Sequence, residues 1–173
     1  MENKAVFLDR DGTINVEKNY LYKIEDFEFE KGVIEGLKIL QKLGYMLIVI
    51  SNQSGISRGY YTKKQADDLF NYMREQLEKE KITINKIYYC PHYKENCNCR
   101  KPKLGLFYKA QQELNINFSK SYAIGDKARD VAICEVEPVK GFIISNEEKI
   151  EKVKNVEICN NFLEAAKKIE KQK

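Results

Sequence analysis

Short apolar runs alternate with amphipathic segments along the chain. The runs are apolar at nearly every position, which is typical of strands buried on both faces of a parallel sheet. We predict strands at residues 5–9, 45–52, 86–91, 121–126 and 140–145, with 156–160 as a weaker last strand. Helical spacing of apolar residues predicts helices within 32–45, 62–80, 104–116, 128–137 and 161–171. Strands alternating with helices imply βαβ units, and so an α/β fold whose parallel sheet is covered by helices on both faces.

Composition indicates an ordinary globular protein. A length of 173 residues suits a single domain, 1–173, with a core of its own. The net charge of +4, from 30 basic and 26 acidic residues, is small and spread along the chain. It favours anionic small molecules over nucleic acid as partners.

The hydropathy of the chain and its first residues indicate where in the cell the protein is located. No apolar run approaches the roughly 20 residues that span a membrane, and the first residues lead straight into a strand rather than a signal peptide. We therefore expect a cytoplasmic protein with no membrane partner. No apolar surface stripe is left over, so we expect a monomer.

Polar residues gather where the predicted strands end. Asp9 ends the first strand, Ser51–Gly55 the second, Cys90–His92 the third and Gly125–Asp126 the fourth. Ligands of such sheets bind beyond the carboxyl ends of the strands. The sequence therefore predicts one active site at this edge.

Three carboxylates, those of Asp9, Asp11 and Asp126, would converge at that edge. Without a cation they would repel one another and raise one another's pKa. Mg²⁺ prefers oxygen ligands and would remove that repulsion. The alternative is that Asp9 and Asp11 only cap a turn, where Asp is common; the third Asp after another strand fits that alternative poorly.

A cysteine–histidine loop follows the third predicted strand. Cys90, His92, Cys97 and Cys99 lie within ten residues, and His92 is the sole histidine. Thiolates plus an imidazole form a closed zinc set, whereas free thiols or a disulfide are the alternatives. The other two cysteines, Cys134 and Cys159, are expected in the core.

The loop runs directly into Arg100 and Lys101. Ordering two long basic side chains on a loose loop costs entropy, so a zinc clip would fix the loop and aim both at the site. All four zinc positions come from the protein, which predicts a structural zinc.

These motifs resemble those of the haloacid dehalogenase superfamily of phosphohydrolases over nearly the whole chain. Asp9-x-Asp11-Gly12-Thr13 resembles motif one, Ser51 motif two, Lys101 motif three, and Gly125-Asp126 with Asp130 motif four. The resemblance implies a three-layer Rossmann-like fold. The segments between motifs are too short for a separate cap domain, so we expect a capless enzyme.

The resemblance also implies roles. Asp9 is the nucleophile that forms an aspartyl-phosphate, and Asp11 protonates the leaving alcohol and then activates water. Ser51 and Lys101 bind the phosphoryl oxygens. Mg²⁺ is held by Asp9, the backbone carbonyl of Asp11, and Asp126. Asp130 orients the metal shell.

Four stretches narrow the resemblance: FLDRDGTIN, SNQSGISRG, YYCPH…CNCRKPKLG and IGDKARD. Together they look like the D-glycero-D-manno-heptose-1,7-bisphosphate 7-phosphatases, with the histidinol-phosphatase domain as a sibling. The loop between His92 and Cys97 is shorter than in some members, and CEVEPVKG replaces a small-residue turn. The resemblance implies a substrate-binding set of Glu17, Lys18, Asn19, Tyr20, Asn52, Gln53, Ser54, Arg100 and Lys127.

The predicted function is Mg-dependent removal of the 7-phosphate of a heptose bisphosphate. One alternative is a histidinol-phosphate phosphatase. A non-enzymatic alternative is a zinc-clipped nucleic-acid binder, which leaves the three aspartates unexplained; a small role on nucleic-acid 3′ ends also stays open.

Overall fold

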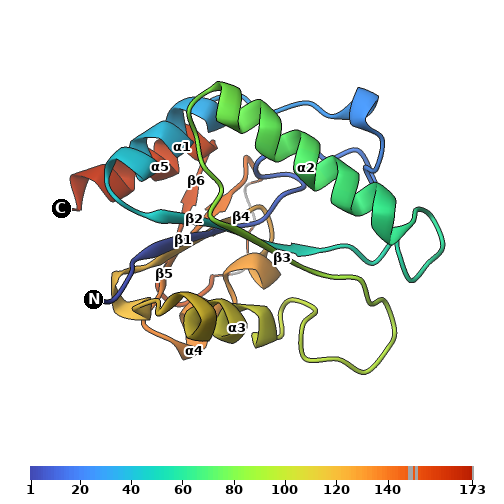
Figure 1. Ribbon diagram of the computed structural model, residues 1–173. Coiled ribbons are helices and arrows are strands. Elements are labelled where there is room, and N and C mark those ends of the chain that lie inside the picture. Colours follow the sequence, from blue (N-terminus) through green and yellow to red (C-terminus); the bar gives the residue numbers. More distant parts are fainter. Residues whose placement is uncertain (148–149, 151, 173) are drawn as a thin grey trace.

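The computed structural model describes residues 1–147, 150 and 152–172. Its centre is a six-stranded, all-parallel sheet of order β3-β2-β1-β4-β5-β6 (Figure 1). The strands are β1 (Ala5–Leu8), β2 (Met46–Asn52), β3 (Lys86–Cys90), β4 (Tyr122–Gly125), β5 (Lys140–Ile144) and β6 (Val156–Cys159). All six lie where the apolar runs predict them.

Helices cover both faces of the sheet (Figure 1). One face carries α1 (Val33–Lys42), α2 (Lys63–Lys79) and α5 (Phe162–Lys171); the other carries α3 (Gly105–Leu114) and α4 (Ile133–Val136). Side chains of β1 alternate between the two layers, with Val6 and Leu8 in one core and Ala5 and Phe7 in the other. This two-sided burial explains why β1 has no polar position, and it confirms the predicted three-layer fold.

Local signals set the helix ends. Thr62 and Gln65 form the predicted capping box of α2. Residues 128–137 differ from the predicted single helix: a 3-10 turn, η3 (Ala128–Val131), precedes a short α4. In that turn the Asp130 carboxylate accepts the backbone N–H of Lys127 at 3.0 Å, so the chain winds tightly around this side chain.

The strand order reverses next to β1. The chain runs outward from β1 to β2 and β3, then crosses back to β4 on the other side of β1 and continues to β5 and β6. Such a switch point opens a crevice between the carboxyl ends of the two neighbouring strands, here β1 and β4.

Short segments surround this crevice. Residues 9–32 form only the 3-10 turn η1 (Ile24–Asp26) before α1, and the connections from β2 to α2 and from β3 to α3 are loops. Over the described residues, loops rather than a cap domain therefore border the site. The same part of the chain contains no helix long and apolar enough to cross a membrane.

Candidate active site

Lys101 and two aspartates form the buried centre of the site. The Lys101 ammonium lies 2.8 Å from Asp9 Oδ1, 2.7 Å from Asp130 Oδ1 and 2.6 Å from the carbonyl oxygen of Ile50. An ammonium has three N–H donors, and each has a partner here. Because the Lys101 side chain is only 1 % exposed, its charge acts on Asp9 with little screening by solvent.

Three carboxylates lie close enough to share one cation. One oxygen each of Asp9, Asp126 and Asp130 lies within 4.8 Å of the others. Burial first, and then the Asp130 charge, raise the pKa of Asp9, although Lys101 opposes the shift. The same two causes raise the pKa of Asp126 to about 6. A hard divalent cation suits this oxygen-rich, mutually repelling set.

Gly12 lets the backbone pass close to this acidic set. Its φ is +79°, and a Cβ built there would lie 2.4 Å from Asp126 Oδ2. Both the left-handed backbone and the close contact with Asp126 require glycine at this position. This explains the glycine of motif one.

Asp11 lies beside Asp9 but is held by different partners. Arg10 Nη2 donates to both carboxylate oxygens, at 2.9 and 3.0 Å, and Asn15 Nδ2 donates to one of them at 3.0 Å. Arg10 is fully buried, with its guanidinium 4.8 Å from the Phe70 ring centre. Arg10 was not among the residues predicted from the sequence. Its position between two aspartates at the end of a buried strand could have indicated it.

Gln53 joins Asp11 to Ser51. Gln53 Nε2 donates to Ser51 Oγ at 2.8 Å and to Asp11 Oδ2 at 3.2 Å, while Tyr61 Oη donates to Gln53 Oε1 at 2.5 Å. An ionised carboxylate only accepts, so Asp11 fixes which way the amide points. With a Ser51 lone pair taken by Gln53, the Ser51 hydroxyl hydrogen is left for another acceptor in the site.

Asn52 ties the neighbouring strand to Lys101. Its Oδ1 accepts the Lys101 N–H at 2.9 Å, and its Nδ2 donates to the Lys101 carbonyl oxygen at 3.1 Å. These paired bonds hold the Lys101 backbone to the end of β2. The backbone of Lys101 is therefore held by β2, independently of the cysteine–histidine loop that precedes Lys101 in the sequence.

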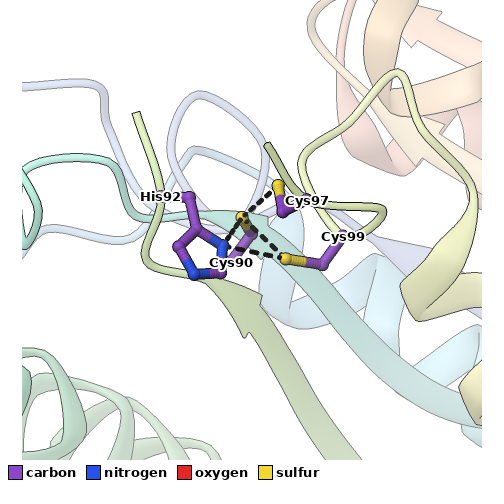
Figure 2. A group of neighbouring side chains, drawn as sticks. All are labelled: Cys90, His92, Cys97 and Cys99. Atoms are coloured by element: carbon purple, nitrogen blue, oxygen red, sulfur yellow. Dashed lines mark hydrogen bonds between the residues drawn. The ribbon is translucent and has the colours of Figure 1, made fainter. Parts of the chain in front are cut away.

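The cysteine–histidine loop brings its four predicted ligands together (Figure 2). Cys90 Sγ lies 3.0 Å from Cys99 Sγ and 3.9 Å from Cys97 Sγ, and His92 Nδ1 lies 3.2 Å from Cys99 Sγ. A tetrahedral zinc ion holds its sulfur ligands about 3.8 Å apart. The donor types and the Cys90–Cys97 distance fit zinc, whereas Cys90 and Cys99 lie closer together than two zinc ligands would. Cys134 and Cys159 are buried in the two cores, as expected.

A cleft of about 230 Å³ opens above the aspartates. Arg100, Lys127 and Arg129 bring three cations suited to an anionic ligand to this cleft, which four acidic residues also line. Arg129 was not selected from the sequence. Lys18 does not line it in the described structure and instead lies 3.2 Å from Glu28 on the surface. The other predicted substrate-binding residues all line it: Glu17, Asn19, Tyr20, Asn52, Gln53, Ser54, Arg100 and Lys127.

A larger groove of about 800 Å³ adjoins the cleft and shares Asp126 and Lys127 with it. Glu17, Glu30, Asp126 and Glu147 line this groove together with Lys31 and Lys127. Among the described residues, neither Asp9 nor Asp11 lines the groove, whereas both line the smaller cleft, so the smaller cleft is the better candidate for a phosphorylated ligand.

Comparison with known proteins places this geometry in a family. The family described as polynucleotide kinase 3 phosphatase matches residues 4–137. A relative from Campylobacter jejuni, D-glycero-alpha-D-manno-heptose-1,7-bisphosphate 7-phosphatase, is 44 % identical over 170 residues, which cover 95 % of this chain and 98 % of the relative. The chain belongs to the family of heptose-1,7-bisphosphate 7-phosphatases.

Further relatives agree with this assignment. A protein from Helicobacter pylori, D-glycero-beta-D-manno-heptose-1,7-bisphosphate 7-phosphatase, is 51 % identical over 131 residues, 75 % of this chain and 76 % of the relative. The crystal structure of D,D-heptose 1,7-bisphosphate phosphatase from B. bronchiseptica, complexed with magnesium and phosphate, shares the fold. Its TM-score is 0.85 at 20 % identity, over 98 % of this chain and 99 % of that one.

These matches decide between the sequence hypotheses. The resemblance to the haloacid-dehalogenase-type phosphatases is confirmed, and so is enzymatic over non-enzymatic function. The relatives favour the heptose phosphatases over the histidinol phosphatases. The roles of individual residues stay predictions.

Proposed function

We propose that this chain hydrolyses the 7-phosphate of D-glycero-D-manno-heptose 1,7-bisphosphate. The observation that carries the proposal is the 44 % identity that extends over 95 % of the chain to a relative bearing that name. The cations Arg100, Lys127 and Arg129, in the cleft that Asp9 and Asp11 line, support a phosphorylated substrate.

The reaction that we propose has two steps. The Asp9 carboxylate attacks phosphorus, and the bond to the C7 oxygen breaks as Asp11 gives that oxygen a proton. Asp11 then takes a proton from water, which attacks phosphorus, releases phosphate and restores the Asp9 carboxylate. Asp11 is held by Arg10, Asn15 and Gln53 and Asp9 by Lys101, so the two carboxylates have different partners, which supports different roles for them.

Charge on the phosphoryl oxygens needs donors that are already in place. We assign this role to the Ser51 hydroxyl as a donor and to Lys101 through its positive charge, because the three N–H groups of Lys101 already have protein acceptors. Asp9, the Asp11 carbonyl and Asp126 would hold Mg²⁺, which when bound neutralises negative charge on the carboxylates and the phosphate. Asp130, bonded to Lys101 and Lys127, would orient this set.

Recognition falls to the loops around the cleft. Arg100 and Lys127 would hold the distal phosphate, and a structural zinc on Cys90, His92, Cys97 and Cys99 would fix the loop that presents Arg100. A single domain, a monomeric state, a cytoplasmic location and the absence of nucleic-acid and membrane partners stay predictions.

Phosphate release tests the proposal. Purified protein with Mg²⁺ is given the α and β anomers of heptose 1,7-bisphosphate, with histidinol phosphate as the competitor. We expect faster turnover of at least one heptose anomer, and ³¹P NMR should show a product that keeps its phosphate at C1. Preference for histidinol phosphate, or loss of the C1 phosphate, would contradict the proposal.

A further inference from the structure

Arg58 sits among three tyrosines at the rim of the cleft. Its guanidinium carbon lies 3.9 Å from the Tyr93 ring centre, 5.2 Å from that of Tyr60 and 5.5 Å from that of Tyr20. Its Nη1 also donates to the Tyr20 hydroxyl oxygen at 2.9 Å. A planar guanidinium can stack on one ring while its edge donates a hydrogen bond, which an ammonium cannot reproduce.

The three rings come from three separate loops. Tyr20 belongs to the segment after β1, Tyr60 to the turn after β2 that also carries Arg58, and Tyr93 to the zinc loop directly after His92. Tyr20 and Tyr60 pack edge to face at 4.8 Å between ring centres. Arg58 therefore contacts side chains from three loops, which follow three different strands of the sheet.

The Tyr20 segment needs such a partner. Asn19 and Tyr20 have φ values of 51° and 66°, consecutive left-handed conformations that non-glycine residues adopt rarely. Conformations of this kind persist only where surrounding contacts hold them. Both residues line the cleft, so their placement shapes the wall that a substrate meets.

Tyr93 links the same cluster to Arg100. The Arg100 guanidinium carbon lies 5.9 Å from the Tyr93 ring centre, and Arg100 Nη1 donates to the His92 carbonyl oxygen at 3.1 Å. Tyr93 therefore contacts Arg58 and lies near Arg100. Arg58 itself is not among the described residues that line the cleft.

We propose that Arg58 is a positioning residue that fastens the Tyr20 wall of the cleft to the zinc loop and so sets selectivity for the extended substrate. This inference rests on the proposed function. Arg58 makes no described contact with Asp9, Lys101 or Asp130, so its loss should spare phosphoryl transfer itself.

Steady-state kinetics of Arg58→Ala on two substrates provide the first test. For heptose 1,7-bisphosphate we expect KM to rise about tenfold. For p-nitrophenyl phosphate, which has neither the sugar hydroxyls nor the second phosphate, we expect kcat and KM within about twofold of the unsubstituted enzyme. Arg58→Lys should fall between, because one ammonium cannot serve both Tyr20 and Tyr93. Lys94→Ala is the control: its ammonium lies 5.5 Å from the Tyr93 ring centre but bridges no loops.

Hydrogen exchange gives a second test that does not depend on the substrate. Backbone amides of residues 17–23 should exchange faster in Arg58→Ala than in the unsubstituted enzyme, and at the unsubstituted rate in Lys94→Ala. Zinc content should be the same in both variants. Unchanged exchange, an unchanged bisphosphate KM, or parallel losses on both substrates would overturn the inference. A parent enzyme without preference for the heptose bisphosphate would instead overturn the proposed function, while the exchange result would still decide the role of Arg58.

Discussion

The buried acidic centre and the rim of the cleft are built in opposite ways. Asp9, Lys101 and Asp130 follow or adjoin strand ends, and the Lys101 ammonium has a protein acceptor for every N–H. The rim consists of loops, in which Tyr20 has a left-handed backbone and Arg58 is partly exposed. The sheet positions the acidic centre, whereas side-chain contacts between loops position the rim.

From this difference we predict that reaction and recognition are separable in this capless enzyme. The groups assigned to the reaction depend on the register of β1, β2 and β4, which the core determines. The groups assigned to recognition depend on the proposed zinc site and on an arginine–tyrosine cluster. Substitutions in the two regions should therefore give different kinetic patterns.

The largest effect should come from Asp9→Asn. An amide cannot form the acyl phosphate, so kcat should fall by about a thousandfold or more on every substrate. Lys101 keeps Asp130 as a partner, so circular dichroism and the melting temperature should stay close to the parent values. Asp68→Asn, at an exposed helix position, is the control that should keep full activity. Turnover by Asp9→Asn would contradict the nucleophile assignment.

Gln53→Ala should have the next largest effect. It removes the donor shared by Ser51 and Asp11, and we expect kcat to fall about tenfold to thirtyfold with a smaller change in KM. The fall should be equal on p-nitrophenyl phosphate and the bisphosphate, because Gln53 would act on the reacting groups. A rise in bisphosphate KM alone would mean that Gln53 belongs to recognition.

Magnesium affinity should depend on pH. Burial and the Asp130 charge raise the pKa of Asp9 and bring that of Asp126 to about 6. A proton then competes with the cation at low pH, so apparent affinity in calorimetry should rise by about tenfold between pH 5.5 and 7.5. Flat affinity over this range would show that the carboxylates are already ionised in the metal-free protein.

The smallest effect should come from Tyr61→Phe. The change removes the hydroxyl that bonds Gln53 Oε1 but keeps the ring stacked on Tyr22 at 5.5 Å. We expect kcat to fall about threefold, equally on both substrates. Tyr22→Phe is the matched control and should leave kcat unchanged. Equal losses in both variants would attribute the effect to the stacked pair rather than to the hydroxyl.

The sequence predicted the strands and the helices apart from 128–137. Periodicity reports burial, and the carboxyl ends of parallel strands must meet at one edge, so Asp9, Ser51 and Asp126 could be placed together. The four candidate zinc ligands, which the structure brings together, stand out in the sequence because donors of two kinds crowd within ten residues. The acidic group that could hold a cation contains Asp130 where the sequence prediction had Asp11.

Side-chain direction was harder to predict. Lys18 lies next to cleft residues in sequence, yet it pairs with Glu28 on the surface. Arg58 was missed because its partner Tyr20 lies on another loop, and no spacing rule reports such a contact. Arg10 was missed although its partner Asp11 is the next residue, and Tyr61 although Gln53 lies in the same connection between β2 and α2. The side-chain positions of loop residues depend on tertiary contacts, and local sequence patterns therefore do not predict them.

The separation of reaction from recognition is tested most directly by a zinc-ligand substitution assayed on both substrates. Cys99→Ser should lose zinc and loosen Arg100, while Asn52 still holds the Lys101 backbone and three acceptors hold its ammonium. We predict that kcat/KM for heptose 1,7-bisphosphate falls about a hundredfold, and that kcat/KM for p-nitrophenyl phosphate falls less than about fivefold. Equal losses on the two substrates in a protein that remains folded would contradict the account.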